Sequence, residues 1–261
     1  MDREKTLEDF GKLLDIMDRL RVECPWDRVQ TLDTLRTNTI EETYELSEAI
    51  LQKDLHEIAK ELGDLLLHIV FYAKIGEEKQ AFDMDYVINH LCDKLVYRHP
   101  HVFGQVQADS AKTVIQNWEQ LKIKEKDGNK TVLSGVPQGL PALIKAFRVQ
   151  EKVANVGFDW EQRSQVWDKV KEEVAEFRTE VQREDTDRME AEFGDVMFSL
   201  VNAARLYGIN PETALERTNR KFIKRFGYLE QQTIRKGRSL KEMTLAQMDE
   251  IWEEAKQFDK E

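Results

Sequence analysis

Two acidic segments, EEVAE at residues 172–176 and EFGD at residues 192–195, decide the fold predicted for this chain. Apolar residues recur at intervals of three and four through both segments, which indicates amphipathic helices. The polar run QREDTD at 182–187 predicts a turn between them. Residues three apart on a helix share a face, about 4.5 Å apart along the axis. An antiparallel hairpin would therefore bring together the carboxylates of Glu173, Glu176, Glu192 and Asp195.

Such a cluster needs protons, basic partners or divalent cations, because carboxylates 4 Å apart repel by about 4 kcal/mol per pair at an effective dielectric near 20. All-carboxylate oxygen ligands suit Mg²⁺, with Mn²⁺ as the alternative. A single E-x-x-E has a simpler explanation, the solvated stripe of an ordinary helix. Here the pattern is repeated 131 residues upstream, as EETYE at 41–45 and ELGD at 61–64. The repeat favours metal binding and predicts a second ligand set, Glu42, Glu45, Glu61 and Asp64.

Composition limits the classes of partner. The net charge of −11 disfavours binding to a nucleic-acid polymer, because the chain has no overall positive charge to neutralise a phosphate backbone. Only two cysteines are present, with no C-x-x-C, so a disulfide framework is not expected. The charged N-terminus lacks the apolar core of a signal peptide, and no apolar run is long enough to span a bilayer. We expect a soluble cytoplasmic protein without membrane contact.

The repeat also predicts an all-α chain of two tandem helical bundles. We expect an N-terminal domain at 1–123, a linker at 124–141, where turn-forming residues gather, and a C-terminal domain at 142–261. No segment alternates with a period of two, so no β-sheet is expected. Pro211 is expected to start a helix that ends near Gly227, and a last helix is expected at 244–258.

The second copy carries two polar groups that the first lacks. Lys169 lies four residues before Glu173, where the first copy has Asn38. Asn202 lies on the acidic face seven residues after Asp195, where the first copy has Phe71. A helical ion pair for the lysine and a satisfied interior amide for the asparagine explain these residues equally well without any ligand.

A pair of cations follows each acidic hairpin at a spacing of four. The first copy has Lys94 and Arg98, and the second has Lys221 and Arg225. Each pair is either a solvated face or a clamp for a polyphosphate, since Lys and Arg neutralise oxygens that a metal does not reach. All five histidines lie in the first half, so the second copy has no Glu-x-x-His pair for a di-iron site and is a poor zinc site.

Taken together, these motifs resemble a known family. The tandem E-E-x-x-E and E-x-x-D pairs, together with CPWD at 24–27, RHPHVF at 98–103 and NVGFDW at 155–160, closely resemble the MazG-type nucleoside triphosphate pyrophosphohydrolases of the all-α superfamily. The resemblance covers nearly the whole chain. It implies two MazG-like domains, a homodimer, and Mg²⁺-dependent hydrolysis of nucleoside triphosphates to the monophosphate and pyrophosphate, by water attack at the α-phosphorus.

Roles carried over by the resemblance place the working site in the second copy and leave the first degenerate or structural. Glu172, Glu173 and Lys169 would act in catalysis, with Glu173, Glu176, Glu192 and Asp195 as metal ligands. Substrate contacts would be Lys169, Arg188, Asn202, Lys221, Arg225 and Trp252. Three alternatives stay open: a narrower dCTP, dUTP or damaged-nucleotide pyrophosphatase, a non-catalytic nucleotide-binding scaffold, and a phosphohydrolase that releases orthophosphate stepwise.

Overall fold

The computed structural model describes residues 2–125, 130–235, 237 and 239–260. Throughout these residues the regular structure is helical and none of it is strand, which confirms the all-α prediction. The chain forms two compact units, Met1–Gln107 and Ala108–Glu261. The predicted linker at 124–141 falls within the second unit, and its residues 126–129 lie outside the described part, so the predicted domain limits stay a prediction.

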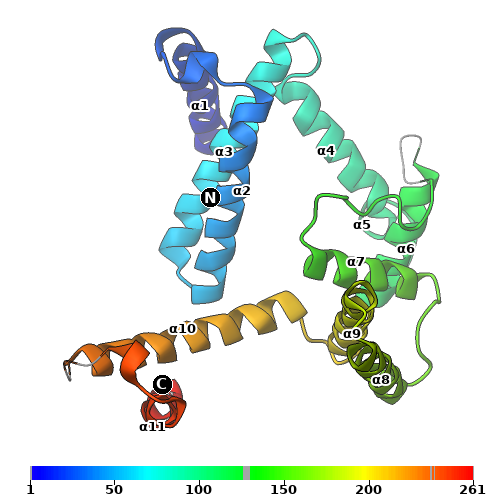
Figure 1. The fold of residues 1–261 in the computed structure, drawn as a ribbon. Coiled ribbons are helices and arrows are strands. Elements are labelled where there is room, and N and C mark those ends of the chain that lie inside the picture. The colour runs from blue at the N-terminus through cyan, green and yellow to red at the C-terminus, as the bar shows by residue number, and fades with distance from the viewer. Residues whose placement is uncertain (1, 126–129, 236, 238, 261) are drawn as a thin grey trace. The chain divides into compact units, whose positions relative to one another are not determined.

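Unit 1 is built around the first acidic hairpin. The apolar faces of its first three helices meet in one buried cluster of Met17, Leu35, Val70, Phe71 and Ile75. In chain order (Figure 1), its helices are α1 Arg3–Glu23, α2 Leu32–Gln52, α3 Leu55–Glu78, α4 Met84–Arg98 and the short α5 Pro100–Phe103, with a 3-10 turn at Asp27–Val29.

Unit 2 carries the second acidic hairpin. Its buried apolar residues include Val166, Val196 and Val201 on the hairpin and Leu229 and Ile251 further along the chain. Its helices are α6 Ala111–Lys124, α7 Ala142–Asn155, α8 Val166–Arg183, α9 Thr186–Leu206, α10 Pro211–Arg235 and α11 Leu245–Lys256, with 3-10 turns at Arg163–Gln165, Leu240–Glu242 and Gln257–Lys260.

The two hairpins turn through the same two-residue connection. Lys53 ends α2 with a left-handed φ of 60°, and Glu184 ends α8 with a φ of 55°. Asp54 and Asp185 follow them and accept hydrogen bonds from backbone N–H groups in the first turns of α3 and α9. The left-handed residue reverses the chain, and the aspartate satisfies N–H groups that the new helix leaves unpaired. This local chemistry holds each pair of acidic helices antiparallel and adjacent.

One sequence expectation is wrong: α10 does not end near Gly227 but continues to Arg235. A glycine inside a helix costs about 1 kcal/mol relative to alanine. Leu229 and Thr233, which follow the glycine, are both buried. Burial of this last part of α10 offsets the glycine cost, and that tertiary packing is not visible in local helix signals.

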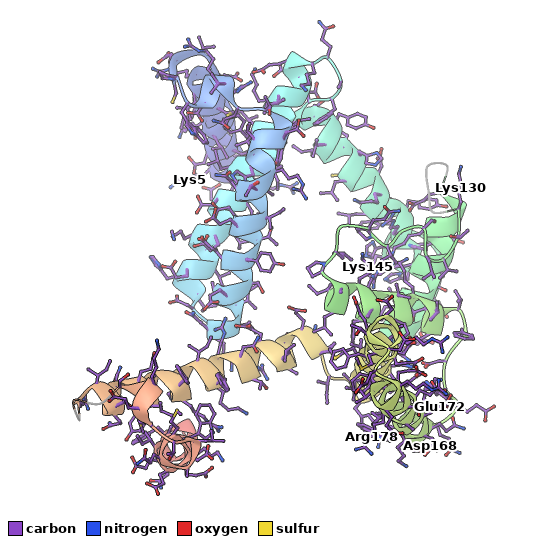
Figure 2. All side chains as sticks on the ribbon, in the orientation of Figure 1. Lys5, Lys130, Lys145, Asp168, Glu172 and Arg178 are labelled. Carbon is purple, nitrogen blue, oxygen red and sulfur yellow. The ribbon has the colours of Figure 1, made fainter. Side chains whose placement is uncertain are left out.

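No helix in the described part of the chain combines the length and the apolar character that a bilayer crossing requires. Figure 2 shows instead that charged side chains such as Glu172 and Arg178 project from α8. These polar faces are typical of helices that bury one stripe and hydrate the other.

Candidate metal centre

In unit 2, the α8–α9 hairpin brings three of the predicted ligands together. Glu173 and Glu176 from α8 and Glu192 from α9 offer carboxylate oxygens that all lie within 4.8 Å of one another. Glu173 is 7% exposed, so one of the three carboxylates is largely removed from water. Asp195, the fourth predicted ligand, is exposed and does not belong to this group.

The electrostatics of this cluster favour a cation. Desolvation, followed by the negative charge of Glu173, raises the pKa of the Glu176 carboxyl above its ordinary value. The ammonium group of Lys169 lies 2.7 Å from Glu173 Oε1 and 2.8 Å from Glu172 Oε1. Hydrogen bonds to Glu172 and then to Glu173 raise the pKa of Lys169, which therefore stays charged. The single positive charge of Lys169 does not balance the several glutamate carboxylates around it, so the net charge of the cluster stays negative.

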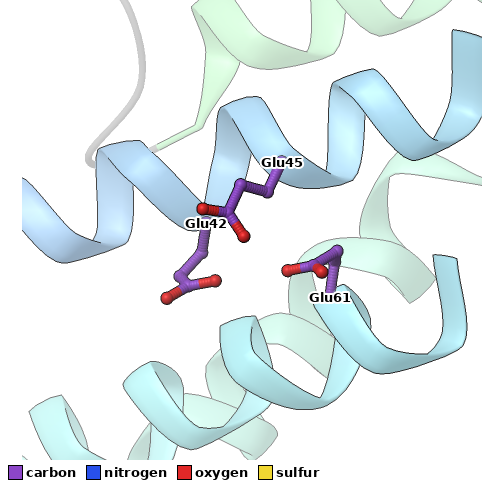
Figure 3. Close-up of side chains that lie close together, drawn as sticks. All are labelled: Glu42, Glu45 and Glu61. Atoms are coloured by element: carbon purple, nitrogen blue, oxygen red, sulfur yellow. The ribbon is translucent and has the colours of Figure 1, made fainter. Parts of the chain in front are cut away.

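The first copy forms an equivalent cluster in unit 1. Glu42 and Glu45 project from α2 toward Glu61 on α3 (Figure 3), with oxygens within 4.8 Å of one another. Glu61 is 3% exposed; its Oε1 accepts a hydrogen bond of 3.0 Å from Lys60, while its Oε2 has no hydrogen-bond partner among the described residues. Desolvation, and then the charges of Asp64 and Glu45, raise the pKa of Glu42. Asp64 itself lies outside the group.

Comparison with known proteins agrees with this duplicated architecture. The MazG nucleotide pyrophosphohydrolase domain matches residues 30–103 and 162–228, so one matched segment contains each acidic cluster. This chain belongs to the MazG family. Its relatives include the nucleoside triphosphate pyrophosphohydrolase of Escherichia coli (strain K12), 39% identical over 257 residues, which cover 96% of this chain and 98% of the relative.

Two further relatives extend this picture. The nucleoside triphosphate pyrophosphohydrolase/pyrophosphatase MazG of Thermotoga maritima is 42% identical over 250 residues, which cover 95% of each chain. The Bacillus subtilis protein YabN is 45% identical over 262 residues, which cover 98% of this chain and 54% of YabN. Likeness to MazG proteins therefore extends along nearly the whole length of the chain and is not confined to the acidic motifs.

The remaining residues singled out from the MazG resemblance lie in several places. Arg188 is exposed, and its Nε lies 3.4 Å from Asp185 at the hairpin turn. The guanidinium carbon of Arg225 lies 5.6 Å from the ring centroid of Trp252, so these two residues meet where α10 packs on α11. Lys221 precedes Arg225 by four residues and is exposed on α10. Their contacts with a nucleotide remain predictions.

Asn202 lies in a region whose chemistry the sequence reasoning missed. Its side-chain oxygen accepts a 2.8 Å hydrogen bond from Arg205, which also donates at 3.0 Å to Asp159. These residues, with Gln150 on α7 and Phe198 on α9, line a cavity of about 460 Å³. The available signal was Gln150 itself, since a polar residue among the apolar positions of α7 indicates a specific interior role.

Proposed function

We propose that this MazG-family chain hydrolyses nucleoside triphosphates to nucleoside monophosphate and pyrophosphate at the unit 2 cluster, with Mg²⁺ as cofactor and Mn²⁺ as a substitute. The observation that carries the proposal is the convergence of Glu173, Glu176 and Glu192 beside the ammonium group of Lys169. Family membership supports it, because the relatives in E. coli and T. maritima are named nucleoside triphosphate pyrophosphohydrolases.

The donor set fits a hard divalent cation. Carboxylate oxygens within 4.8 Å of one another can reach a single ion, and oxygen-only ligands match Mg²⁺ or Mn²⁺. Asp195 follows Glu192 by three residues, so it lies on the same side of α9 and is the natural fourth ligand. A bound ion of this kind would neutralise phosphate charge and polarise phosphoryl oxygens.

In this proposal the chain's own residues hold the triphosphate and move one proton. Lys169, Lys221 and Arg225 neutralise phosphate oxygens that carry charge in the transition state. Glu172 lies outside the group of three but binds the same ammonium as Glu173, so it is the carboxylate left to accept a proton from the attacking water. The water oxygen bonds to the α-phosphorus, the bond from that phosphorus to the bridging oxygen breaks, and pyrophosphate leaves with that oxygen.

The second copy is proposed as the working site. Lys169 pairs with Glu173 there, whereas the corresponding residue of the first copy is the neutral Asn38. Paired alanine variants test the assignment: Glu173→Ala should abolish pyrophosphate release and Glu42→Ala should leave most of it. The opposite pattern would assign the activity to the first copy.

Product analysis tests the reaction itself. A panel of NTPs and dNTPs is incubated with and without Mg²⁺, and monophosphate, pyrophosphate and orthophosphate are quantified. The proposal requires equal amounts of monophosphate and pyrophosphate, and only with the ion. Stepwise orthophosphate release would identify a different phosphohydrolase, turnover of one base alone would identify a narrower pyrophosphatase, and no turnover would leave a nucleotide-binding scaffold.

We also propose a homodimer. Ile223 and Ile234 on α10 are 69% and 73% exposed, and Phe222 on the same helix is 56% exposed. Exposed apolar side chains gathered on one helix are typical of surfaces that another chain covers. Sedimentation equilibrium of the intact chain measures the state directly, and a concentration-independent monomer mass would contradict the proposal.

A further inference from the structure

The α2–α3 hairpin of unit 1 has its apolar core at only one end. The buried cluster lies at the open end, where Leu35 of α2 packs with Val70 and Phe71 of α3. Between residues 42 and 64, all of which the structure describes, the only fully buried residues are Ala49 and Glu61. Apolar burial therefore holds α2 against α3 mainly at the open end, and contributes less at the end nearest the turn.

Glu61 is an unusual residue to bury at the turn end. It is 3% exposed, and its Oε1 accepts a 3.0 Å hydrogen bond from Lys60, whose own side chain is 58% exposed. Its Oε2 is buried and has no hydrogen-bond partner among the described residues. A buried polar group without a partner destabilises the folded state, and a charged group does so most. A cation beside Oε2 would remove that cost.

Two further carboxylates lie beside this oxygen. Figure 3 shows Glu42 and Glu45 of α2 gathered with Glu61 of α3 between the two helices, and oxygens of all three lie within 4.8 Å of one another. Carboxylates this close repel one another, so without an ion they push the two helices apart. Oxygen-only donors suit Mg²⁺ or Mn²⁺. With such an ion, the same three side chains would join α2 to α3.

The surroundings of this cluster differ from those of the second copy. Phe71 occupies the position of Asn202 and is 2% exposed, and the guanidinium carbon of Arg21 lies 5.3 Å from the centroid of its ring. The neutral Asn38 stands where the second copy has Lys169. A buried ring and a neutral amide thus replace two polar groups that the second copy keeps beside its carboxylates. These replacements favour an ion that stays with the protein over one that serves a substrate.

We infer that unit 1 holds a resident divalent cation between Glu42, Glu45 and Glu61, and that its role is structural. It joins α2 to α3 at the turn end of the hairpin and takes no part in hydrolysis. This inference does not depend on the proposed function, because it concerns the other cluster. An ion in unit 1 stabilises unit 1 alone, so the Mg²⁺ response of unit 2 still depends on Glu173.

Counting bound ions tests the inference directly. Mn²⁺ can replace Mg²⁺ at oxygen sites, and electron paramagnetic resonance of the unbound Mn²⁺ gives the number of ions bound per chain. The full-length wild type should bind two ions, and Glu61→Gln and Glu173→Gln should each bind one. Glu41→Gln is the matched control, because it removes a neighbouring charge of α2 outside the group of three, and it should still bind two.

Hydrogen exchange then measures the structural role. At a Mg²⁺ concentration ten times Kd, mass action predicts that backbone amides at residues 44–60 of the wild type exchange about tenfold more slowly than after EDTA treatment. Glu61→Gln should exchange at the same rate under both conditions, whereas Glu173→Gln should keep the full difference. Glu42→Gln, which changes the other helix, should behave as Glu61→Gln does. Both variants keep the size of the side chain, and circular dichroism checks that they fold.

Two ions bound by Glu61→Gln, or exchange at residues 44–60 of the wild type that does not respond to Mg²⁺, would overturn the inference. A single wild-type ion that Glu173→Gln abolishes would also overturn it and would leave the proposed function intact. A single wild-type ion that Glu61→Gln abolishes would support the structural site and contradict the proposed function at unit 2.

Discussion

Replacing Glu173 by glutamine should stabilise metal-free unit 2 and remove the response of that unit to Mg²⁺. Charges 4.8 Å apart, the upper separation within the cluster, repel by about 3.5 kcal/mol at an effective dielectric of 20. Glu192 is half-buried, so water screens part of its repulsion with Glu173, and the exposed Glu176 adds little to that repulsion. The lost ion pair with Lys169 opposes the gain by about 0–1 kcal/mol, because the lysine is partly exposed. The net expectation is a gain of about 1–2 kcal/mol.

Thermal unfolding with and without Mg²⁺ measures both effects. For a domain of this size, about 1–2 kcal/mol corresponds to an increase of about 2–8 °C in the Tm of the metal-free protein. Wild-type protein at a Mg²⁺ concentration about 100 times Kd should gain about 2.7 kcal/mol, and Glu173→Gln should lose most of that gain. Glu180→Gln is the matched control, because Glu180 lies on α8 and is equally buried, at 7% exposure.

The control should keep the full Mg²⁺ response, since Glu180 pairs with Arg183 and lies outside the cluster. Two results would refute the reasoning. One is a lower Tm of metal-free Glu173→Gln, which would mean that carboxylate repulsion is not the dominant effect at this position. The other is an intact Mg²⁺ response in that variant, which would remove Glu173 from the ligand set.

Three further predictions test other parts of the site. Lys169→Met should lower kcat/KM for nucleoside triphosphates by about 10–100-fold through loss of a charge-assisted phosphate contact, measured by pyrophosphate release. Because the folded-state pKa of Glu176 is raised, its contribution to stability is lost as pH rises through that pKa; Mg²⁺ should therefore raise Tm more at pH 7 than at pH 5. Arg21→Met should destabilise unit 1 by about 1–2 kcal/mol in urea unfolding, because it removes the ion pair with the exposed Glu78 and a hydrogen bond to the backbone carbonyl of Gln30, yet leave pyrophosphate release unchanged.

Most of the fold could be predicted because the relevant signals are local. Apolar spacing predicted the helices, and the two acidic segments predicted both hairpins. Asp54 and Asp185 cap their helices through bonds to residues only a few positions away. The end of α10 could not be predicted in this way, because its last turns are stabilised by burial of Leu229 and Thr233.

In the candidate site, too, only the features that depend on local sequence could be predicted. Helical spacing brought Glu173 and Glu176 onto one face, and the duplicated pattern identified the partner helix. The cavity beside Asn202 could not be predicted, because it depends on α7 packing against α9 and on the pairing of Arg205 with Asp159, 46 residues away. Side-chain direction at Asp195 is likewise a tertiary property that spacing does not give.

The two-residue connection within each hairpin has a consequence for how the centre arises. All candidate ligands of a copy fall within residues 42–64 or 173–195, on neighbouring helices that meet through low-contact-order packing. Such local contacts form early and quickly when a chain folds. Each centre is thus a self-contained unit of two neighbouring helices, and the two units can differ around the same carboxylates, as they do at Asn38 against Lys169 and at Phe71 against Asn202.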